Sequence, residues 1–274
     1  MDYRILFTDI DGTLLKDDKT VSADVLTAMQ EYTARGGRIV LSSGRPLPSV
    51  LEVAGQLKLP TQNLYIIAYN GALVYDLGAQ KAIWEKRIPL ATVRTILDLA
   101  HENGIHCHTY TDDTIISELD TPELHKYLMH IHMPYLIKED AVSYLSSLGE
   151  CMPFKLLAIT MEDRQPLIDF AARIAERLGG QIHTFFSAHS YLECCRKDAS
   201  KGNAVRFLCQ HLCINWQHTV AAGDAANDLS MLRAAGTSYA MRNASEEVRQ
   251  AADHITAKTN DEDGILEIFQ RMQK

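Results

Sequence analysis

The sequence predicts an α/β protein whose core is a doubly wound, Rossmann-like parallel sheet with an inserted α+β domain. Apolar, strand-like runs alternate with amphipathic helical patterns in the first part of the chain, which is typical of such a sheet. The same alternation resumes near the C-terminus. The pattern between them, from about residue 83 to 192, has a different character and predicts the insertion.

The first strand is expected at residues 4–9, RILFTD, which is mostly apolar, as in a strand buried on both faces of a parallel sheet. A helical pattern then starts at Ser22 and stops at Gly36 and Gly37. The elements expected next are strand 38–42, helix 47–57 and strand 65–68.

The insertion has helix and strand patterns of its own, so we expect it to fold as a compact unit. Its expected elements are an edge strand 83–88, helix 92–103, strands 105–110 and 114–117, strand 154–160, helix 165–178 and strands 182–186 and 191–195. The core then continues with helix 201–212, strand 219–222, helix 229–235 and strand 238–241. We therefore expect a core of residues 1–82 and 193–274 and a cap of residues 83–192.

Composition excludes several classes of function. Of 274 residues, 46% are hydrophobic and 23% charged, as in a globular protein with a full core. The net charge of −8 argues against a general attraction to nucleic acid or to an anionic membrane. The first residues, MDYRILFTDIDG, lack the basic start and long apolar stretch of a signal peptide, so we expect a cytoplasmic protein. No protein partner is implied.

The cysteines and histidines have a structural and a functional interpretation. Cys209 and Cys213 are four residues apart in a helical pattern, which suits either a metal or redox pair or two small apolar side chains. His125, His130 and His132 form a local group that is either a metal site or a set of surface side chains. We favour the structural interpretation in both cases.

The strongest chemical signal is Asp9-Ile10-Asp11-Gly12-Thr13, at the end of the first strand. Ligands of open α/β sheets bind beyond the carboxyl ends of strands, and residues i and i+2 of a strand share a face. Asp9 and Asp11 can therefore point at the same place, and Gly12 permits a sharp turn. The alternative is that the two acids only cap the next segment.

A second acidic group, Asp224, Asn227 and Asp228, follows the apolar strand 219–222. It is either an ordinary helix N-cap or part of the same site. If the two strands are neighbours, several carboxylates converge and repel one another unless a cation is present. Because all the ligands are oxygens, we expect Mg²⁺.

Two further motifs suit a phosphate. Ser43-Gly44-Arg45 follows a strand, and its hydroxyl and backbone N–H groups can hold phosphate oxygens, although Ser-Gly is also common in turns. Lys201 lies in the first turn of a helix, where the dipole disfavours a cation, so it is either a solvated lysine or the partner of an anion.

In chain order, these four segments resemble the motifs of the haloacid dehalogenase superfamily, and specifically of its Cof-type (class IIB) phosphatases. The first motif is Asp9-Ile10-Asp11-Gly12-Thr13, the second Ser43-Gly44-Arg45, the third Lys201-Gly202 and the fourth Gly223-Asp224 through Asn227-Asp228. The resemblance covers the whole chain and implies a phosphomonoester hydrolase of small phosphorylated metabolites, with Mg²⁺ as cofactor. It implies that Asp9 is the nucleophile that forms an aspartyl phosphate and that Asp11 is the general acid and base. Lys201 would then balance the charge around Asp9.

The resemblance also implies the ligands. Mg²⁺ would be held by Asp9, Asp224 and the backbone carbonyl of Asp11, with Asp228 supporting the metal shell. The residues expected to bind phosphate or substrate are Gly12, Ser43, Gly44, Arg45, Asn70, Lys201 and Asn227. The insertion would close over the site and recognise the leaving group. Two alternatives remain: a sugar phosphomutase of the same fold, and a binding protein that has lost catalysis.

Overall fold

The computed structural model describes residues 4–129, 131, 133–149, 151–161 and 163–272. The chain forms two compact units, one made of Met1–Glu85 and Ala199–Lys274 and the other of Lys86–Asp198. Within the described residues, no helix has both the length and the apolar character needed to cross a bilayer.

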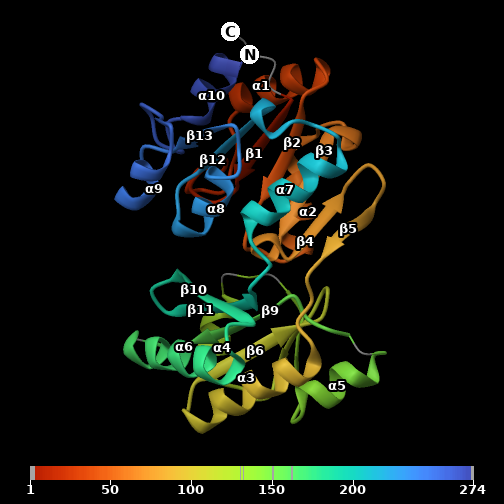
Figure 1. The fold of residues 1–274 in the computed structure, drawn as a ribbon, viewed down its shortest axis with the longest axis vertical. Coiled ribbons are helices and arrows are strands. Elements are labelled where there is room, and N and C mark those ends of the chain that lie inside the picture. The colour runs from red at the N-terminus through yellow and green to blue at the C-terminus, as the bar shows by residue number, and fades with distance from the viewer. Residues whose placement is uncertain (1–3, 130, 132, 150, 162, 273–274) are drawn as a thin grey trace. The chain divides into compact units, whose positions relative to one another are not determined.

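The first unit is built on an eight-stranded sheet in the order β14-β13-β12-β1-β2-β3-β4-β5 (Figure 1). The strands from β14 to β3 are parallel, and β4 and β5 are antiparallel to their neighbours. Their bounds are β1 Ile5–Asp9, β2 Arg38–Ser42, β3 Leu64–Ala68, β4 Leu73–Asp76, β5 Lys81–Glu85, β12 Thr219–Gly223, β13 Thr237–Ala240 and β14 His254–Ile255.

The strand order reverses between β1 and β12. From β1 the chain moves through β2 to β3 on one side, whereas from β12 it moves through β13 to β14 on the other. In open α/β sheets, ligands bind at this reversal, outside the carboxyl ends of the strands. Asp9 ends β1 and Gly223 ends β12, so the first and fourth motifs both lie at the reversal.

Helices cover both faces of this sheet. Ser22 caps the helix that starts at Ala23 by accepting a hydrogen bond from the N–H of Val25. Ser200 caps the helix that starts at Lys201 by accepting one from the N–H of Asn203. The helices of this unit are α1 Ala23–Ala34, α2 Leu47–Leu57, α7 Lys201–His211, α8 Leu229–Leu232, α9 Glu246–Ala251 and α10 Ile265–Met272. Right-handed crossovers in opposite directions place α1 and α2 on one face and α8 and α9 on the other.

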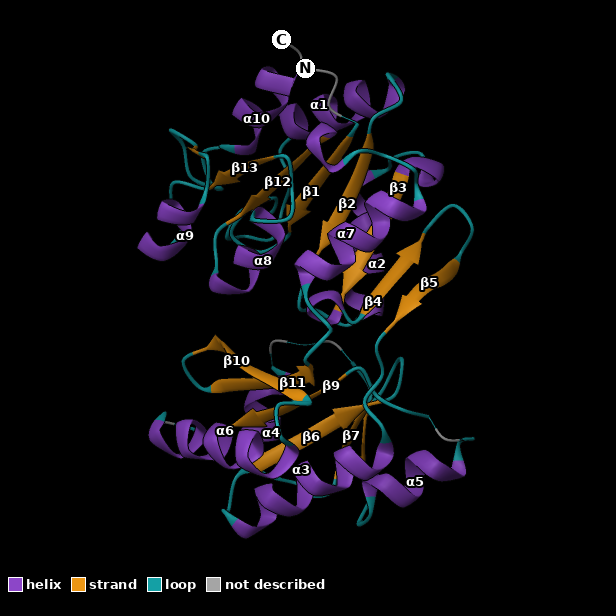
Figure 2. Ribbon diagram, viewed as in Figure 1, coloured by secondary structure: helices purple, strands orange, loops and turns teal. Residues whose placement is uncertain are grey.

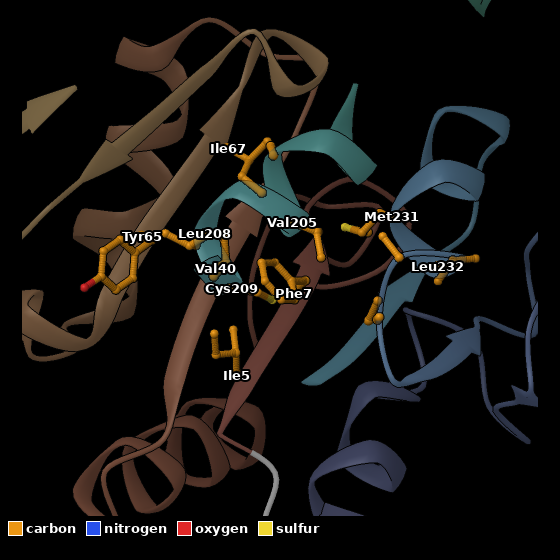
Figure 3. Packing of buried hydrophobic residues seen from close by; sticks show 14 of the residues in the cluster. Ile5, Phe7, Val40, Tyr65, Ile67, Val205, Leu208, Cys209, Met231 and Leu232 are labelled. Carbon is orange, nitrogen blue, oxygen red and sulfur yellow. The ribbon is translucent and has the colours of Figure 1, made fainter. Parts of the chain in front are cut away.

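Figure 3 shows the core beneath α7 and α8. Val205, Leu208 and Cys209 of α7 pack on Ile5 and Phe7 of β1, together with side chains from β2, β3 and α8. Because β1 is buried along its whole length, its last residue, Asp9, is held in a fixed position.

The second unit is a six-stranded sheet in the order β10-β11-β9-β6-β7-β8, antiparallel except for β7 and β8 (Figure 2). Its strands are β6 His106–Tyr110, β7 Ile115–Ser117, β8 Tyr135–Ile137, β9 Lys155–Ile159, β10 Ile182–Ala188 and β11 Tyr191–Arg196. Its helices are α3 Leu90–Glu102, α4 Pro122–Leu128, α5 Ala141–Ser147 and α6 Gln165–Leu178. Residues of α3, α5 and α6 share one apolar core with the sheet, and α4 packs in a smaller core around Tyr110.

Several elements differ from the sequence expectations. The expected edge strand 83–88 is β5, which ends at Glu85, and the second unit begins at Lys86. A division after residue 192 would cut through β11, whose hydrogen bonds to β9 and β10 hold it in the second sheet. The unit accordingly extends to Asp198.

The helix expected at 201–212 ends at His211, so Cys213 lies outside it, with a φ of 52°. Cys213 is exposed whereas Cys209 is buried, and both are free thiols. The imidazole of the exposed His125 lies 2.7 Å from a carboxylate oxygen of Asp120. His130 and His132 lie outside the described residues.

Candidate active site

Lys201, in the third motif, contacts acids of the first and fourth motifs. Its Nζ lies 2.5 Å from Oδ1 of Asp9 and 2.6 Å from Oδ1 of Asp228, and it also donates to the backbone carbonyl of Ser42 over 3.2 Å. All three side chains at this junction are buried, and Lys201 is only 1% exposed. The cation in the first turn of α7 is therefore explained by two carboxylates that offset its unfavourable position.

Asp228 also holds the turn after β12. Its Oδ2 accepts hydrogen bonds from the backbone N–H groups of Asp224 and Ala225, over 3.0 and 3.1 Å. A Cβ on Gly223 would lie 2.5 Å from the Cβ of Asp228, so only glycine fits at this position. Asp228 thus fixes both the ammonium of Lys201 and the backbone that carries Asp224.

Asp224 reaches back to the loop after β1. Its Oδ1 accepts a hydrogen bond of 2.8 Å from the hydroxyl of Thr13. Gly12 has a φ of 78°, and a Cβ there would lie 2.6 Å from Oδ2 of Asp224. Glycine is therefore required both for the turn and for the close approach of the carboxylate.

The buried acids carry more negative charge than Lys201 neutralises. Burial and repulsion from Asp228 raise the pKa of Asp9 well above its ordinary range, although Lys201 lowers it. Burial and Asp228 likewise raise the pKa of Asp224 from 3.8 to about 6. For Lys201, burial acts to lower the pKa, but the two carboxylates outweigh it and the pKa is raised.

This donor set fits a hard divalent cation. One carboxylate oxygen from each of Asp9, Asp224 and Asp228 lies within 4.8 Å of the others. The ligands are all oxygens, and a cation would relieve the repulsion that raises the pKa of Asp9 and Asp224. Among the described residues, this acidic cluster is the candidate metal centre, with Asp9 and Asp228 buried and Asp224 half-buried, and the side chain of Asp11 is not part of it.

The side chain of Asp11 is bound instead by two positively charged side chains. Arg45 donates from Nε to Oδ2 and from Nη2 to Oδ1, each over 2.7 Å, and Nζ of Lys19 lies 2.8 Å from Oδ1. Burial raises the pKa of Asp11, but the hydrogen bonds from Arg45 and Lys19 outweigh it, so the pKa is lowered. The structure therefore brings the second motif to the first through Arg45 and Asp11.

The remaining predicted residues gather beside this pair. Ser43 is buried, its hydroxyl accepts the N–H of Arg45 over 3.1 Å, and its carbonyl accepts the N–H of Asn70 over 3.0 Å. The amide of Asn227 donates to Oδ1 of Asn70 over 3.0 Å. A Cβ on Gly44 would lie 2.8 Å from Nδ2 of Asn70.

Sequence reasoning missed three contributors to this site. The hydroxyl of Thr13 holds Asp224, Lys19 holds Asp11, and the amide of Asn243 donates to the carbonyl of Gly12 over 2.8 Å. Thr13 carries a signal, because it directly follows the glycine of the first motif. Lys19 and Asn243 lie in loops where the sequence pattern does not distinguish them from other polar residues.

Comparison with known proteins decides the family. A model of the haloacid dehalogenase-like hydrolases matches residues 6–269, which is nearly the whole chain. The chain belongs to the haloacid dehalogenase-like hydrolases. The resemblance inferred from the four motifs, the fold class and the assignment to the phosphatases of this family are thereby confirmed.

Two relatives and one solved structure illustrate the similarity. YxeH of Bacillus subtilis is 32% identical over 96% of this haloacid dehalogenase-like chain and 96% of its own. YitU of Bacillus subtilis, named 5-amino-6-(5-phospho-D-ribitylamino)uracil phosphatase, is 28% identical over 95% of this chain and 94% of its own. The crystal structure of TM0651 from Thermotoga maritima is 32% identical, with a TM-score of 0.85 over 98% of this chain and 97% of that one.

Proposed function

We propose that this protein is a Mg²⁺-dependent phosphomonoester hydrolase that acts on small phosphorylated metabolites through an aspartyl phosphate on Asp9. One observation carries the proposal: Asp9 ends a buried strand, at 2.5 Å from the ammonium of Lys201 and within a cluster of acids that suits a cation. A carboxylate in this position is oriented, and its charge can be screened from that of a phosphate.

Asp9, Asp224 and the backbone carbonyl of Asp11 would hold the Mg²⁺, and Asp228 would support it. The ion would supply charge neutralisation between the carboxylate and the phosphate. The protein itself orients these groups, because Thr13 holds Asp224 and Asp228 holds the turn between them.

In the first step, an oxygen of Asp9 attacks phosphorus as the bond from phosphorus to the leaving oxygen breaks. Asp11 gives a proton to that oxygen, so the product leaves as an alcohol. In the second step, Asp11 takes a proton from water as the water oxygen attacks phosphorus. The bond between phosphorus and Asp9 then breaks, which releases inorganic phosphate and restores the carboxylate.

Asp11 must carry a proton in the first step, but Arg45 and Lys19 favour its ionised form. We infer that the phosphate of the substrate competes with Asp11 for Arg45. Ser43, Gly44 and Asn70 lie next to Arg45 and would bind the phosphate oxygens through a hydroxyl, a backbone N–H and an amide.

The unit Lys86–Asp198 would recognise the leaving group. It has its own sheet and its own apolar core, so it is a folded element and not a loop. Binding energy from the rest of the substrate would help to orient the ester for attack. Joining Glu85 to Ala199 by a short linker should raise KM for the best metabolite far more than for p-nitrophenyl phosphate. A folded capless protein with unchanged substrate ranking would refute this role.

The direct test of function is phosphate release from p-nitrophenyl phosphate and from a panel of phosphorylated metabolites, with Mg²⁺ and with excess chelator. We expect phosphate release that depends on Mg²⁺ and is abolished in Asp9→Asn. Interconversion of two sugar phosphates without phosphate release would identify a mutase instead. An absence of any turnover on the panel would favour a binding protein.

A further inference from the structure

Asn70 has a buried amide nitrogen without a hydrogen-bond acceptor. The residue is 5% exposed, and its Nδ2 has no partner within the described part of the chain. Its backbone is left-handed, with φ 55° and ψ 31°, a conformation that asparagine adopts more readily than most residues. A buried donor without an acceptor is costly and rare in folded proteins, so it calls for a ligand or another explanation.

The backbone around Asn70 is firmly held. Its N–H donates to the carbonyl of Ser43 over 3.0 Å, next to the loop that we expect to bind phosphate. The following residue, Gly71, packs so tightly on the start of α7 that a Cβ there would lie 2.2 Å from the carbonyl carbon of Ser200. The amide of Asn70 is therefore attached to a fixed backbone between the second and third motifs.

Asn227 is hydrogen-bonded to the other end of that amide. Its Nδ2 donates to Oδ1 of Asn70 over 3.0 Å, so the oxygen is occupied and the nitrogen remains available. A side-chain amide can turn over and exchange its donor and acceptor, and only its partners select one orientation. Gly44 leaves room beside the nitrogen, because any Cβ there would lie 2.8 Å from it.

We propose that Asn227 is a positioning residue that orients the amide of Asn70, so that Nδ2 of Asn70 donates to an oxygen of the bound phosphoryl group. This inference rests on the proposed function, since it requires a phosphate beside Ser43 and Gly44. It gives the fourth motif a second role, because the loop that carries Asp228 also orients a phosphate ligand of another loop.

The test is a double-mutant cycle on the full-length protein, with inorganic phosphate as the probe in the presence of Mg²⁺ and calorimetry as the readout. Asn70→Gly removes the amide and still permits the left-handed backbone. It should weaken phosphate binding at least roughly tenfold, as expected for a lost hydrogen bond to a charged group. Binding as tight as that of the wild type would overturn the proposal.

Asn227→Asp distinguishes an effect on the orientation of the Asn70 amide from a direct effect of residue 227 on phosphate. A carboxylate only accepts, so it would bind Nδ2 of Asn70 and turn the amide oxygen toward the phosphate. Its negative charge acts on phosphate as well, and the same substitution in the Asn70→Gly background measures that effect alone. We expect the loss of affinity to be roughly tenfold greater when Asn70 is present, since the competent orientation is then rarely populated.

Asn227→Ala removes the hydrogen bond that we propose orients the Asn70 amide, and it adds no charge. If the two amide orientations become about equally populated, phosphate binding should weaken about twofold, and only when Asn70 is present. Equal losses from Asn227→Asp in both backgrounds would show that Asn227 does not act through Asn70. Phosphate release from p-nitrophenyl phosphate by the wild type, measured in parallel, tests the proposed function separately from this cycle.

Discussion

Arg45 binds the carboxylate of Asp11 through two hydrogen bonds of 2.7 Å, one to each oxygen, although the residues are 34 positions apart. Such a bidentate pair fixes the carboxylate in orientation as well as in charge. The proposed proton donor is therefore held at a defined place before substrate binds.

Removing the acid should separate the two chemical steps. In Asp11→Asn, p-nitrophenolate can still leave without a proton, so Asp9 should become phosphorylated. Water would then lack its base, and steady-state turnover should fall by roughly 10²–10⁴-fold. Rapid mixing should show a burst of nitrophenol equal to the enzyme concentration, followed by slow release. With an alkyl phosphate no burst should occur. An equal burst with both esters would contradict the role of Asp11 as acid.

The buried ammonium of Lys201 should matter for stability as well as for activity. Lys201→Met leaves Asp9 and Asp228 without their shared cation, and breaking a buried ion pair typically costs about 3–5 kcal/mol. Chemical denaturation of the metal-free protein measures this loss. Adding Asp9→Asn to Lys201→Met should recover part of it, because one uncompensated charge is removed. If the double variant is less stable than Lys201→Met, repulsion between the acids is not the dominant cost.

Metal binding should depend on pH through Asp224, whose pKa is raised to about 6. Protons compete with the cation for its carboxylate, so the affinity for Mg²⁺ should fall as pH decreases below about 6. In the metal-free protein the effect on stability has the opposite sign. A carboxyl with a raised folded-state pKa stabilises the fold below the unfolded pKa of 3.8, and this contribution is lost as pH rises through about 6.

Calorimetric titration of Mg²⁺ at several pH values measures the affinity, and Asp224→Asn is the matched variant. Its remaining Mg²⁺ binding should be weaker and should change less between pH 5 and 7, roughly the range in which Asp224 titrates. Ca²⁺ should bind and inhibit, since it prefers more ligands at longer distance. Full activity in excess chelator would contradict a role for the metal in catalysis.

A chain of buried polar groups in the second unit should destabilise the protein in acid. His106 and His108 are joined by a 3.0 Å hydrogen bond, and His108 continues to the hydroxyl of Tyr110 over 2.9 Å. Burial lowers the pKa of His106 from 6.5 to about 4, and it also lowers that of His108 well below 6.5. A base with a lowered folded-state pKa stabilises the fold above 6.5, and this contribution is lost as pH falls through about 4.

For His106 alone the loss should amount to roughly 3 kcal/mol, at about 1.4 kcal/mol per pH unit. The measurement is the free energy of unfolding between about pH 7 and pH 4, for the wild type and for His106→Gln, whose pH dependence should be flatter. His189→Gln is the matched control, because His189 is exposed in the same unit. A slope that His106→Gln leaves unchanged would show that this histidine does not contribute to acid unfolding.

Sequence periodicity was sufficient to predict most of the longer strands and helices. Strand 38–42, helix 47–57 and helix 165–178 were predicted with the bounds that the structure has, because each is a clear apolar pattern between turn residues. Short elements were missed, such as β8, whose three residues are all exposed, and α5, which has only two turns. Their position depends on pairing with distant strands and helices, which local pattern does not encode.

The motifs selected residues that the structure brings together, but they did not predict the partners of those residues, and they left out Lys19 and Asn243. The contacts of Lys201 with Asp9 and Asp228 join positions 192 and 27 residues apart, and only the strand order brings them together. The same holds for Asn70 and Asn227, which are separated by 157 residues. The role of Lys19 depends on a loop conformation with a φ of 66°, which its sequence does not predict.

The most direct test of the account is to identify the phosphorylated residue. The Asp11→Asn protein should be mixed with p-nitrophenyl phosphate and Mg²⁺, quenched in acid during the burst and digested for mass spectrometry. We predict one phosphoryl group per chain, on the peptide that contains Asp9, and none when Asp9→Asn is added. A burst that leaves Asp9 unmodified, or an undeamidated Asp9→Asn protein with wild-type turnover, would contradict the assignment of Asp9 as the nucleophile.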